Sequence, residues 1–151
     1  MDFIRDKNVR IRAAAIIIEE KKILLVKHKK NDKEYWLLPG GGVKYGESLV
    51  NALKRELFEE LNLKVDVKDI VYINDSINIE EERHIVNVCF RCLINEGKIK
   101  INKDHRLVGY NFIAFEKIQS LQIYPNIKQE LIDYLKNDSS NKSYLGERWE
   151  E

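Results

Sequence analysis

Three glutamates in one short segment, Glu56, Glu59 and Glu60, are spaced so that they could bind a divalent cation together. At about 100° per residue of an α-helix, their carboxylates fall within a sector of roughly 100°. Like charges at these spacings cost about a few tenths of a kcal/mol per pair, so a compensating positive charge is expected. Mg²⁺ and Mn²⁺ bind such hard oxygen donors together with water and phosphate oxygens. The pattern therefore indicates a metal and phosphate site, although three acidic residues alone more often belong to an ordinary surface helix.

The carboxylates need a helix to hold them, and the sequence from Leu49 to Leu61 predicts one. Ser48 can cap its first turn, and neither glycine nor proline interrupts it. Asn62 follows it, and asparagine is the next-best residue after glycine at a left-handed helix end. Leucines repeat every four residues along one edge of the acidic sector: Leu53, Leu57 and Leu61. If this edge is buried, the carboxylates lie at the margin of a packed interface. The charged face of an ordinary surface helix would instead point to solvent.

The segment from Gly41 to Leu63 resembles the Nudix hydrolase family, whose box is G-x5-E-x7-R-E-U-x-E-E-x-G-U, with U a bulky aliphatic residue. Eight of its nine specified positions match: Gly41, Glu47, Arg55, Glu56, Leu57, Glu59, Glu60 and Leu63. Asn62 stands where the family has glycine, a conservative change for the backbone. Residues 36–40, WLLPG, also look like the family's usual lead-in. The resemblance implies an α/β fold, an α/β/α sandwich with a mixed β-sheet.

The resemblance also implies a pyrophosphatase activity, in which water attacks a phosphoanhydride bond of a nucleoside diphosphate linked to another group, with Mg²⁺ or Mn²⁺ as cofactor. The implied metal ligands are one carbonyl and three carboxylates: Gly40, Glu56, Glu59 and Glu60. Gly41, Gly42 and Glu47 would shape the loop before the helix. The implied catalytic residues are Arg55, which could orient Glu59 by an i,i+4 ion pair, then Glu56 and Glu59, and Asp104 in a later loop. Glu56 is a candidate for both ligand and general base, and Glu96 is the second candidate for the role of Asp104.

Substrate contacts are less well defined by the sequence. Arg10 and Arg12 share one face of a predicted strand and Lys27 ends another, so they could bind phosphate or simply face solvent. Four aromatic residues could stack on a base, although core packing is favoured for them: Tyr35, Trp36, Tyr72 and Phe112. Residue 78 is asparagine where many ADP-ribose hydrolases of the family carry proline, and residues 79–81 lack the tyrosine of diadenosine polyphosphate hydrolases. A nucleoside triphosphate or a nucleotide sugar is therefore the default substrate.

Two other classes of function remain as alternatives. The domain could bind a nucleotide as a catalytically silent sensor, but such domains often lose box carboxylates, and all three are present here. An RNA-end pyrophosphohydrolase would need a basic groove, which a formal net charge of +1 does not supply in an obvious way. No DNA partner is expected.

The remaining elements follow from hydrophobic patterns. Strands are predicted at 9–18 and 23–28, joined as a hairpin, then at 35–38, 65–74, 83–94, 99–101 and 110–115, with the glycines at 40–42 in the loop that leads into the helix. An amphipathic helix is predicted from Pro125 to Lys136, packed on the side of the sheet opposite the first helix. Cys89 and Cys92 should point to opposite faces of one strand as buried free thiols.

The chain has 151 residues, of which 44% are hydrophobic and 34% charged, which is typical of one domain with a sizeable core. We expect the Nudix domain to span 1–136 and a polar linker and C-terminal tail to span 137–151. A disordered tail is slightly favoured, but residues 144–149 could dock on the core or on a second copy in a homodimer. The sequence shows no signal peptide and no membrane span, so a cytoplasmic location is expected.

Overall fold

The computed structural model describes residues 8–102, 106–137, 139–140 and 142–148. Its strands are β1 (Arg10–Ile16), β2 (Ile18–Glu19), β3 (Lys22–Lys30), β4 (Lys33–Leu37), β5 (Gly40–Gly42), β6 (Lys64–Asn78), β7 (Arg83–Glu96), β8 (Leu107–Ala114) and β9 (Tyr144–Glu147). Its helices are α1 (Leu49–Leu61), α2 (Phe115–Ile118) and α3 (Lys128–Asn137). None of the described helices is long and apolar enough to cross a lipid bilayer.

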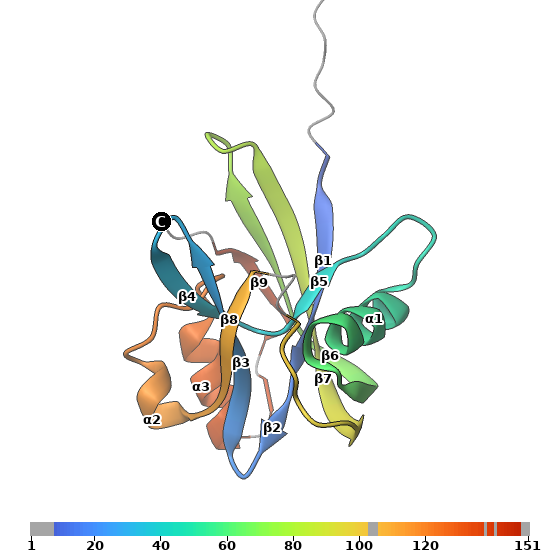
Figure 1. Ribbon diagram of the computed structural model, residues 1–151. Helices are drawn as coiled ribbons and strands as arrows, with labels where there is room; N and C mark the ends of the chain where they lie inside the picture. Colours follow the sequence, from blue (N-terminus) through green and yellow to red (C-terminus); the bar gives the residue numbers. More distant parts are fainter. Residues whose placement is uncertain (1–7, 103–105, 138, 141, 149–151) are drawn as a thin grey trace, which may run out of the picture.

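Two sheets form the centre of the molecule (Figure 1). The first is five-stranded in the order β5-β1-β7-β6-β9, and it is mixed because β1 pairs in parallel with β7 and β6 in parallel with β9. In the second sheet, β3 pairs in antiparallel fashion with β2, β4 and β8. Helix α1 lies on one side of the first sheet, and α3 lies on its other side (Figure 1). The predicted α/β/α sandwich is confirmed, with a second sheet that the sequence did not separate from the first.

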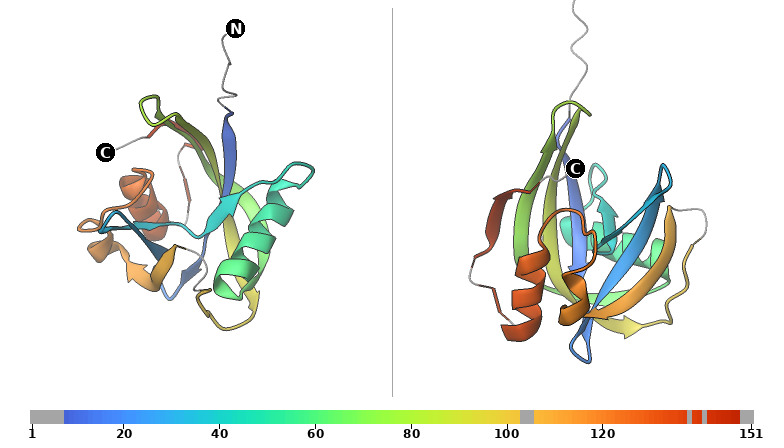
Figure 2. Two further views of the ribbon diagram at one scale, coloured as in Figure 1. Left: turned by 45° about the horizontal axis from the view of Figure 1, so that its top comes forward. Right: turned by 90° about the vertical axis from the view of Figure 1, so that its left-hand side faces the viewer.

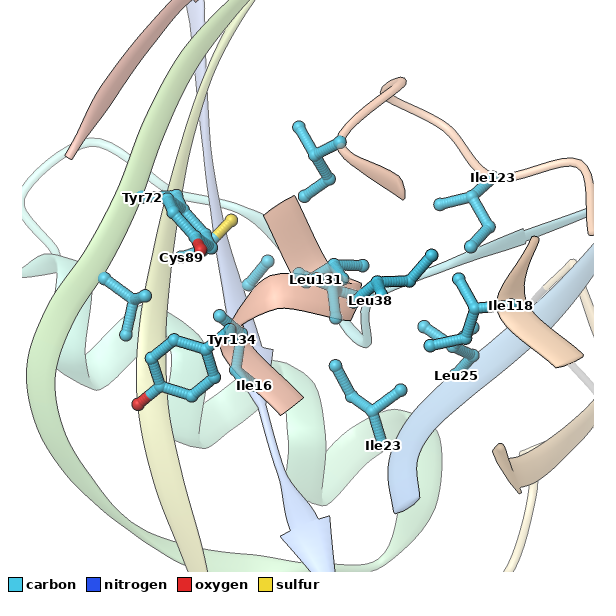
Figure 3. Close-up of a cluster of buried hydrophobic side chains, with 14 of the residues drawn as sticks. Ile16, Ile23, Leu25, Leu38, Tyr72, Cys89, Ile118, Ile123, Leu131 and Tyr134 are labelled. Carbon is cyan, nitrogen blue, oxygen red and sulfur yellow. The ribbon is translucent and has the colours of Figure 1, made fainter. Parts of the chain in front are cut away.

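Each side of the first sheet has its own hydrophobic core. Under α1, buried leucines of the helix, Leu53, Leu57 and Leu61, pack with Ala13 and Ala15 of β1. On the opposite side, Leu131 and Tyr134 of α3 pack with Ile16 and Cys89 (Figure 3). The two free cysteines lie in different cores, Cys89 on the α3 side and Cys92 on the α1 side, which confirms the sequence interpretation.

The first predicted strand, residues 9–18, is broken at Ile17 into β1 and β2. β1 pairs with β5 and β7 in the first sheet, whereas β2 pairs with β3 in the second. The hairpin therefore joins β2 to β3, and β1 is not part of it. The three glycines, predicted in a loop, form strand β5 against β1, with Gly41 opposite Ala13.

Two further predictions differ from the structure. The predicted strand at 99–101 is absent, and this stretch instead closes the end of α1, where Lys100 N–H donates to Leu61 O and Asn102 N–H to Glu60 O, both at 3.0 Å. Helix α3 begins at Lys128 and not at Pro125. Of the two expectations for the C-terminal tail, the structure shows docking on the core: β9 extends the first sheet beside β6, and Leu145 is buried.

Candidate active site

Local capping fixes both ends of α1. The Ser48 hydroxyl accepts a hydrogen bond from Asn51 N–H at 3.0 Å, as expected for an N-cap. Asn62 has the left-handed conformation, with φ 60° and ψ 29°, and its N–H donates to Phe58 O at 3.0 Å. Its side-chain amide also donates to Lys98 O at 3.3 Å. The predicted helix and both caps are confirmed.

Arg55 joins the acidic side chains of α1 to the loop that precedes it. Its guanidinium makes two hydrogen bonds to the Glu47 carboxylate, at 2.7 and 3.0 Å. Nη1 contacts Glu56 Oε1 at 2.8 Å and Glu59 Oε2 at 3.2 Å, so the expected i,i+4 ion pair with Glu59 is present. Nη2 donates to Gly42 O at 3.1 Å. The hydrogen bonds from Arg55 lower the pKa of Glu47 to about 2, so this carboxylate is ionised at neutral pH.

The glycine strand β5 brings the main chain close to the acidic helix. A Cβ atom at Gly41 would overlap the Glu56 carboxylate, and a Cβ atom at Gly40 would overlap the Ala13 carbonyl oxygen. At Gly42, by contrast, a Cβ atom would meet nothing within 4 Å. Two of the three glycines are therefore needed for close approach, one to β1 and one to Glu56.

Glu60 is the buried member of the acidic group. It is 8% exposed, and its Oε2 atom is buried without a hydrogen-bond partner. Burial raises the pKa of Glu60 to about 7, assisted by the negative charge of Glu56 and opposed by the positive charge of Arg12. A buried carboxylate without a partner is costly, so this atom is suited to a ligand that supplies positive charge.

The donor set fits a hard divalent cation. Arg55 contacts one oxygen of Glu56 and one of Glu59, which leaves the second oxygen of each, and Glu60 Oε2, as candidate ligands. Among the described residues, no group of three or more His, Cys, Asp or Glu side chains is already gathered closely enough to hold a metal ion. Metal binding by Glu56, Glu59, Glu60 and the Gly40 carbonyl therefore stays a prediction from the sequence, and it would require the carboxylates to converge.

The two arginines that the sequence predicts on one face of a strand differ in burial. Arg10 is exposed, whereas Arg12 is partly buried and donates from Nη2 to Leu38 O at 2.7 Å. Burial lowers the pKa of Arg12, and the negative charges of Glu60 and Glu56 oppose that shift. The charge of Arg12 thus interacts with the acidic helix, whereas Arg10 is exposed, and substrate binding by either arginine stays a prediction from the sequence.

His28 of β3 lies beside Tyr35 of β4. Its ring centroid lies 5.7 Å from that of Tyr35. Burial, together with the positive charges of Arg12 and Arg106, lowers the pKa of His28 to about 4, so the ring is neutral at pH 7. The sequence could have indicated this burial, because His28 follows buried Val26 by two residues and buried Leu24 by four and so lies on the same face of the strand.

The other candidates have different settings. Lys27 forms an ion pair with Glu34 at 3.2 Å and lies over the Trp36 ring at 5.0 Å, so its observed contacts are with β4. Glu96 pairs with Lys64 across the β6–β7 hairpin at 4.0 Å. Asp104 lies outside the described residues.

The four aromatic candidates also have different surroundings. Tyr72 is 3% exposed in the core and donates to Glu130 O at 2.9 Å, and Phe112 and Trp36 pack against the two cores. Tyr35 packs against the α1-side core, lies beside His28 and meets Tyr124 edge-on, with centroids 5.1 Å apart, whereas the Tyr72 ring meets only Tyr134 of the α3-side core among the recorded ring contacts of the described residues. Core packing is thus the main role of the other three.

Comparison with known proteins decides the family. The family model described as NUDIX domain matches residues 9–135, which include the glycine strand, the Arg55 network, α1 and all but the last two residues of α3. The chain belongs to the NUDIX family. The NUDIX hydrolase from Nitrosomonas europaea superposes with a TM-score of 0.76 at 17% identity, covering 88% of this chain and 92% of that one. At this identity the match supports the fold.

Two relatives match part of the chain at more than 30% identity. An ADP-ribose pyrophosphatase of Methanocaldococcus jannaschii is 34% identical over 90 residues, 59% of this chain and 53% of the relative. The nucleoside triphosphatase NudI of Salmonella paratyphi B is 32% identical over 98 residues, 59% of this chain and 66% of the relative. The matches thus span about half to two thirds of these relatives.

Proposed function

We propose that this NUDIX protein is a pyrophosphohydrolase: with Mg²⁺ or Mn²⁺, it cleaves a phosphoanhydride bond in a nucleoside diphosphate linked to another group. The observation that carries the proposal is the buried, unpartnered Glu60 Oε2, which lies on the same helix as Glu56 and Glu59 while Arg55 holds the other two carboxylates. A divalent cation bound there would neutralise phosphate oxygens and lower the pKa of an attacking water.

The residues of the chain have distinct parts in this mechanism. Arg55, fixed by Glu47, holds one oxygen of Glu56 and one of Glu59 and so orients both side chains. Glu56 lies against the β5 backbone and can accept a proton from water or bind the cation. Arg12, whose positive charge interacts with Glu60 and Glu56, would bind a phosphate oxygen of the substrate.

The relatives support the reaction type more strongly than the substrate. Both an ADP-ribose pyrophosphatase and a nucleoside triphosphatase cleave phosphoanhydride bonds, and they differ in the group beyond the phosphates. Asn78, in place of the proline that many ADP-ribose hydrolases carry, favours a nucleoside triphosphate or a nucleotide sugar.

A panel of nucleotides tests the proposal. Purified protein is incubated with each nucleoside triphosphate, ADP-ribose and UDP- and GDP-sugars, with Mg²⁺ or Mn²⁺ and with excess chelator, and the products are identified by mass. We expect at least one substrate to be cleaved between phosphates only when the cation is present. Binding of a nucleotide without any cleavage would instead favour the sensor alternative.

A further inference from the structure

Strand β9 lies beyond the segment that the NUDIX model matches, yet it is bonded firmly to the fold. It lies beside β6 at the edge of the first sheet (Figures 1 and 2). Leu145 is 7% exposed and belongs to the α3-side core. The Tyr144 hydroxyl donates to Asp75 Oδ2 at 2.5 Å. This segment is therefore an integral part of the structure.

Arg148, directly after β9, connects three parts of the chain. Its backbone N–H donates to Asp75 O of β6 at 2.8 Å. Its guanidinium donates to Asn126 O at 3.1 Å and forms an ion pair with Glu130 of α3 at 2.6 Å. In return, Asn126 N–H donates to Arg148 O at 3.3 Å. One residue thus fixes the segment before α3 to the edge of the first sheet.

That segment, residues 122–126, lies beside Trp36 of β4. Trp36 N–H donates to Gln122 O at 2.8 Å, and Tyr124 N–H donates to Trp36 O at 3.0 Å. The Tyr124 ring meets the Tyr35 ring at 89° with centroids 5.1 Å apart, and Tyr35 in turn lies beside His28. Arg12 donates to Leu38 O, directly after β4, at 2.7 Å, and its charge also interacts with Tyr35. A continuous set of contacts therefore runs from Arg148 to the neighbourhood of Arg12.

We propose that Arg148 is a positioning residue for substrate binding: it holds residues 122–126 so that the rings of Tyr124 and Tyr35 form one wall of the substrate site beside Arg12. The wall would contact the nucleoside part of the substrate, because aromatic rings bind flat bases and riboses while Arg12 binds phosphate. This inference rests on the proposed function. The two hydrogen bonds with Trp36 hold Gln122 and Tyr124, and Arg148 holds the end of the segment at Asn126.

The test measures nucleotide binding and turnover in full-length protein. Kd is measured for ADP, GDP, CDP and UDP with Mg²⁺, and the tightest of the four is used for all variants. Arg148→Gln should raise Kd, and KM of any substrate found, by about three- to tenfold, since it removes charged hydrogen bonds. The value of kcat should change by less than about twofold, because Arg148 does not touch the acidic helix. Unchanged Kd in a folded Arg148→Gln protein would overturn the proposal.

Two more variants keep the test decisive. Glu130→Ala removes the ion pair from the α3 side and should raise Kd to a similar degree, so it replaces Arg148→Gln if that protein does not fold. Tyr144→Phe is the matched control, since it removes a bond from β9 to β6 and leaves residues 122–126 untouched. It should lower the Tm and leave Kd unchanged. An equal rise of Kd in Tyr144→Phe would show a general loss of stability and overturn the positioning role.

A double variant separates the proposal from an indirect effect. Tyr124→Leu should raise Kd by itself, and Tyr124→Leu with Arg148→Gln should be no weaker than Tyr124→Leu alone, because both changes act through the same wall. If the increases in Kd of the two single variants multiply in the double variant, the proposal is overturned. Failure of the unmodified protein to hydrolyse any substrate overturns the proposed function alone, whereas failure to bind any of the four diphosphates overturns the positioning role.

Discussion

The carboxylate of Glu56 lies against the backbone of Gly41, so close that a methyl group at position 41 would overlap it. Strand β5 therefore sets the position of this side chain from one side, and Arg55 sets it from the other at 2.8 Å. Gly41→Ala should displace Glu56, and a displacement of about 1 Å in a catalytic group can cost on the order of 10²-fold in rate. We expect kcat to fall by about that factor in a folded protein.

Gly42→Ala is the matched control for this prediction, because a Cβ atom there would meet nothing within 4 Å. It should leave kcat within about twofold of the unmodified protein, as expected for a change without steric conflict. Equal losses in the two variants would show that general distortion of β5, and not the contact with Glu56, limits activity.

Glu60→Gln tests the buried carboxylate. The variant removes charge at a position that is 8% exposed while keeping the size of the side chain, so metal-assisted turnover should fall by roughly 10³-fold. Without metal, the Tm should be unchanged or higher, since burial of an unpaired carboxylate is relieved. Near-normal turnover in folded Glu60→Gln protein would remove Glu60 from the site.

Removal of divalent cations should abolish activity and also lower stability. Ligands that bind only the folded state stabilise it, so addition of Mg²⁺ or Mn²⁺ to metal-free protein should raise its Tm. The rise should be much smaller in Glu60→Gln. Full hydrolysis in excess chelator, with the metal content shown to be negligible, would contradict the proposed mechanism.

Asn62→Gly tests the one departure from the family box. Glycine accepts the left-handed conformation without strain but adds entropy to the unfolded chain, and the variant also loses the hydrogen bond to Lys98 O. These effects oppose each other, so denaturant unfolding should show a change of no more than about 1 kcal/mol and turnover should barely change. A much larger loss would mean that the asparagine side chain has a role beyond capping.

From the hydrogen bond between Tyr144 and Asp75, we expect the stability to depend on pH. Hydrogen bonds from Tyr144 and then from His84 hold the pKa of Asp75 below its ordinary value of 3.8. The folded state therefore gains stability from ionised Asp75 above that value and loses it as the pH falls below it. Tyr144→Phe should reduce this acid-side loss, measured as Tm between pH 5 and the acid limit of folding, and an unchanged acid profile would contradict the assignment.

The elements that the sequence predicted well depend on local interactions. The bounds of α1 follow from Ser48 and Asn62, each of which acts within one turn of a helix end, and from a leucine repeat that neither glycine nor proline interrupts. The Arg55–Glu59 pair is likewise a property of i,i+4 spacing. The separation of Cys89 from Cys92 follows from the alternation of side chains along a strand.

Strand pairing was decided only in three dimensions. The residues after Arg12, 13–18, are all apolar. The sequence of such a run does not indicate where the chain passes from one sheet to the other. The glycines of β5 were predicted in a loop because they have no side chains that could show a strand pattern, yet their pairing with β1 places the backbone against Glu56.

The sequence by itself determined that three carboxylates share one helix with Arg55, since helical spacing alone fixes that arrangement. Only the tertiary structure decided which of them is buried, and that Arg12 rather than Arg10 lies close to their charge. It also placed His28, Tyr35 and Tyr124 together, from two strands and a segment far along the chain. Such contacts depend on how two sheets pack on each other, and the periodicity of a single strand contains no information about that packing.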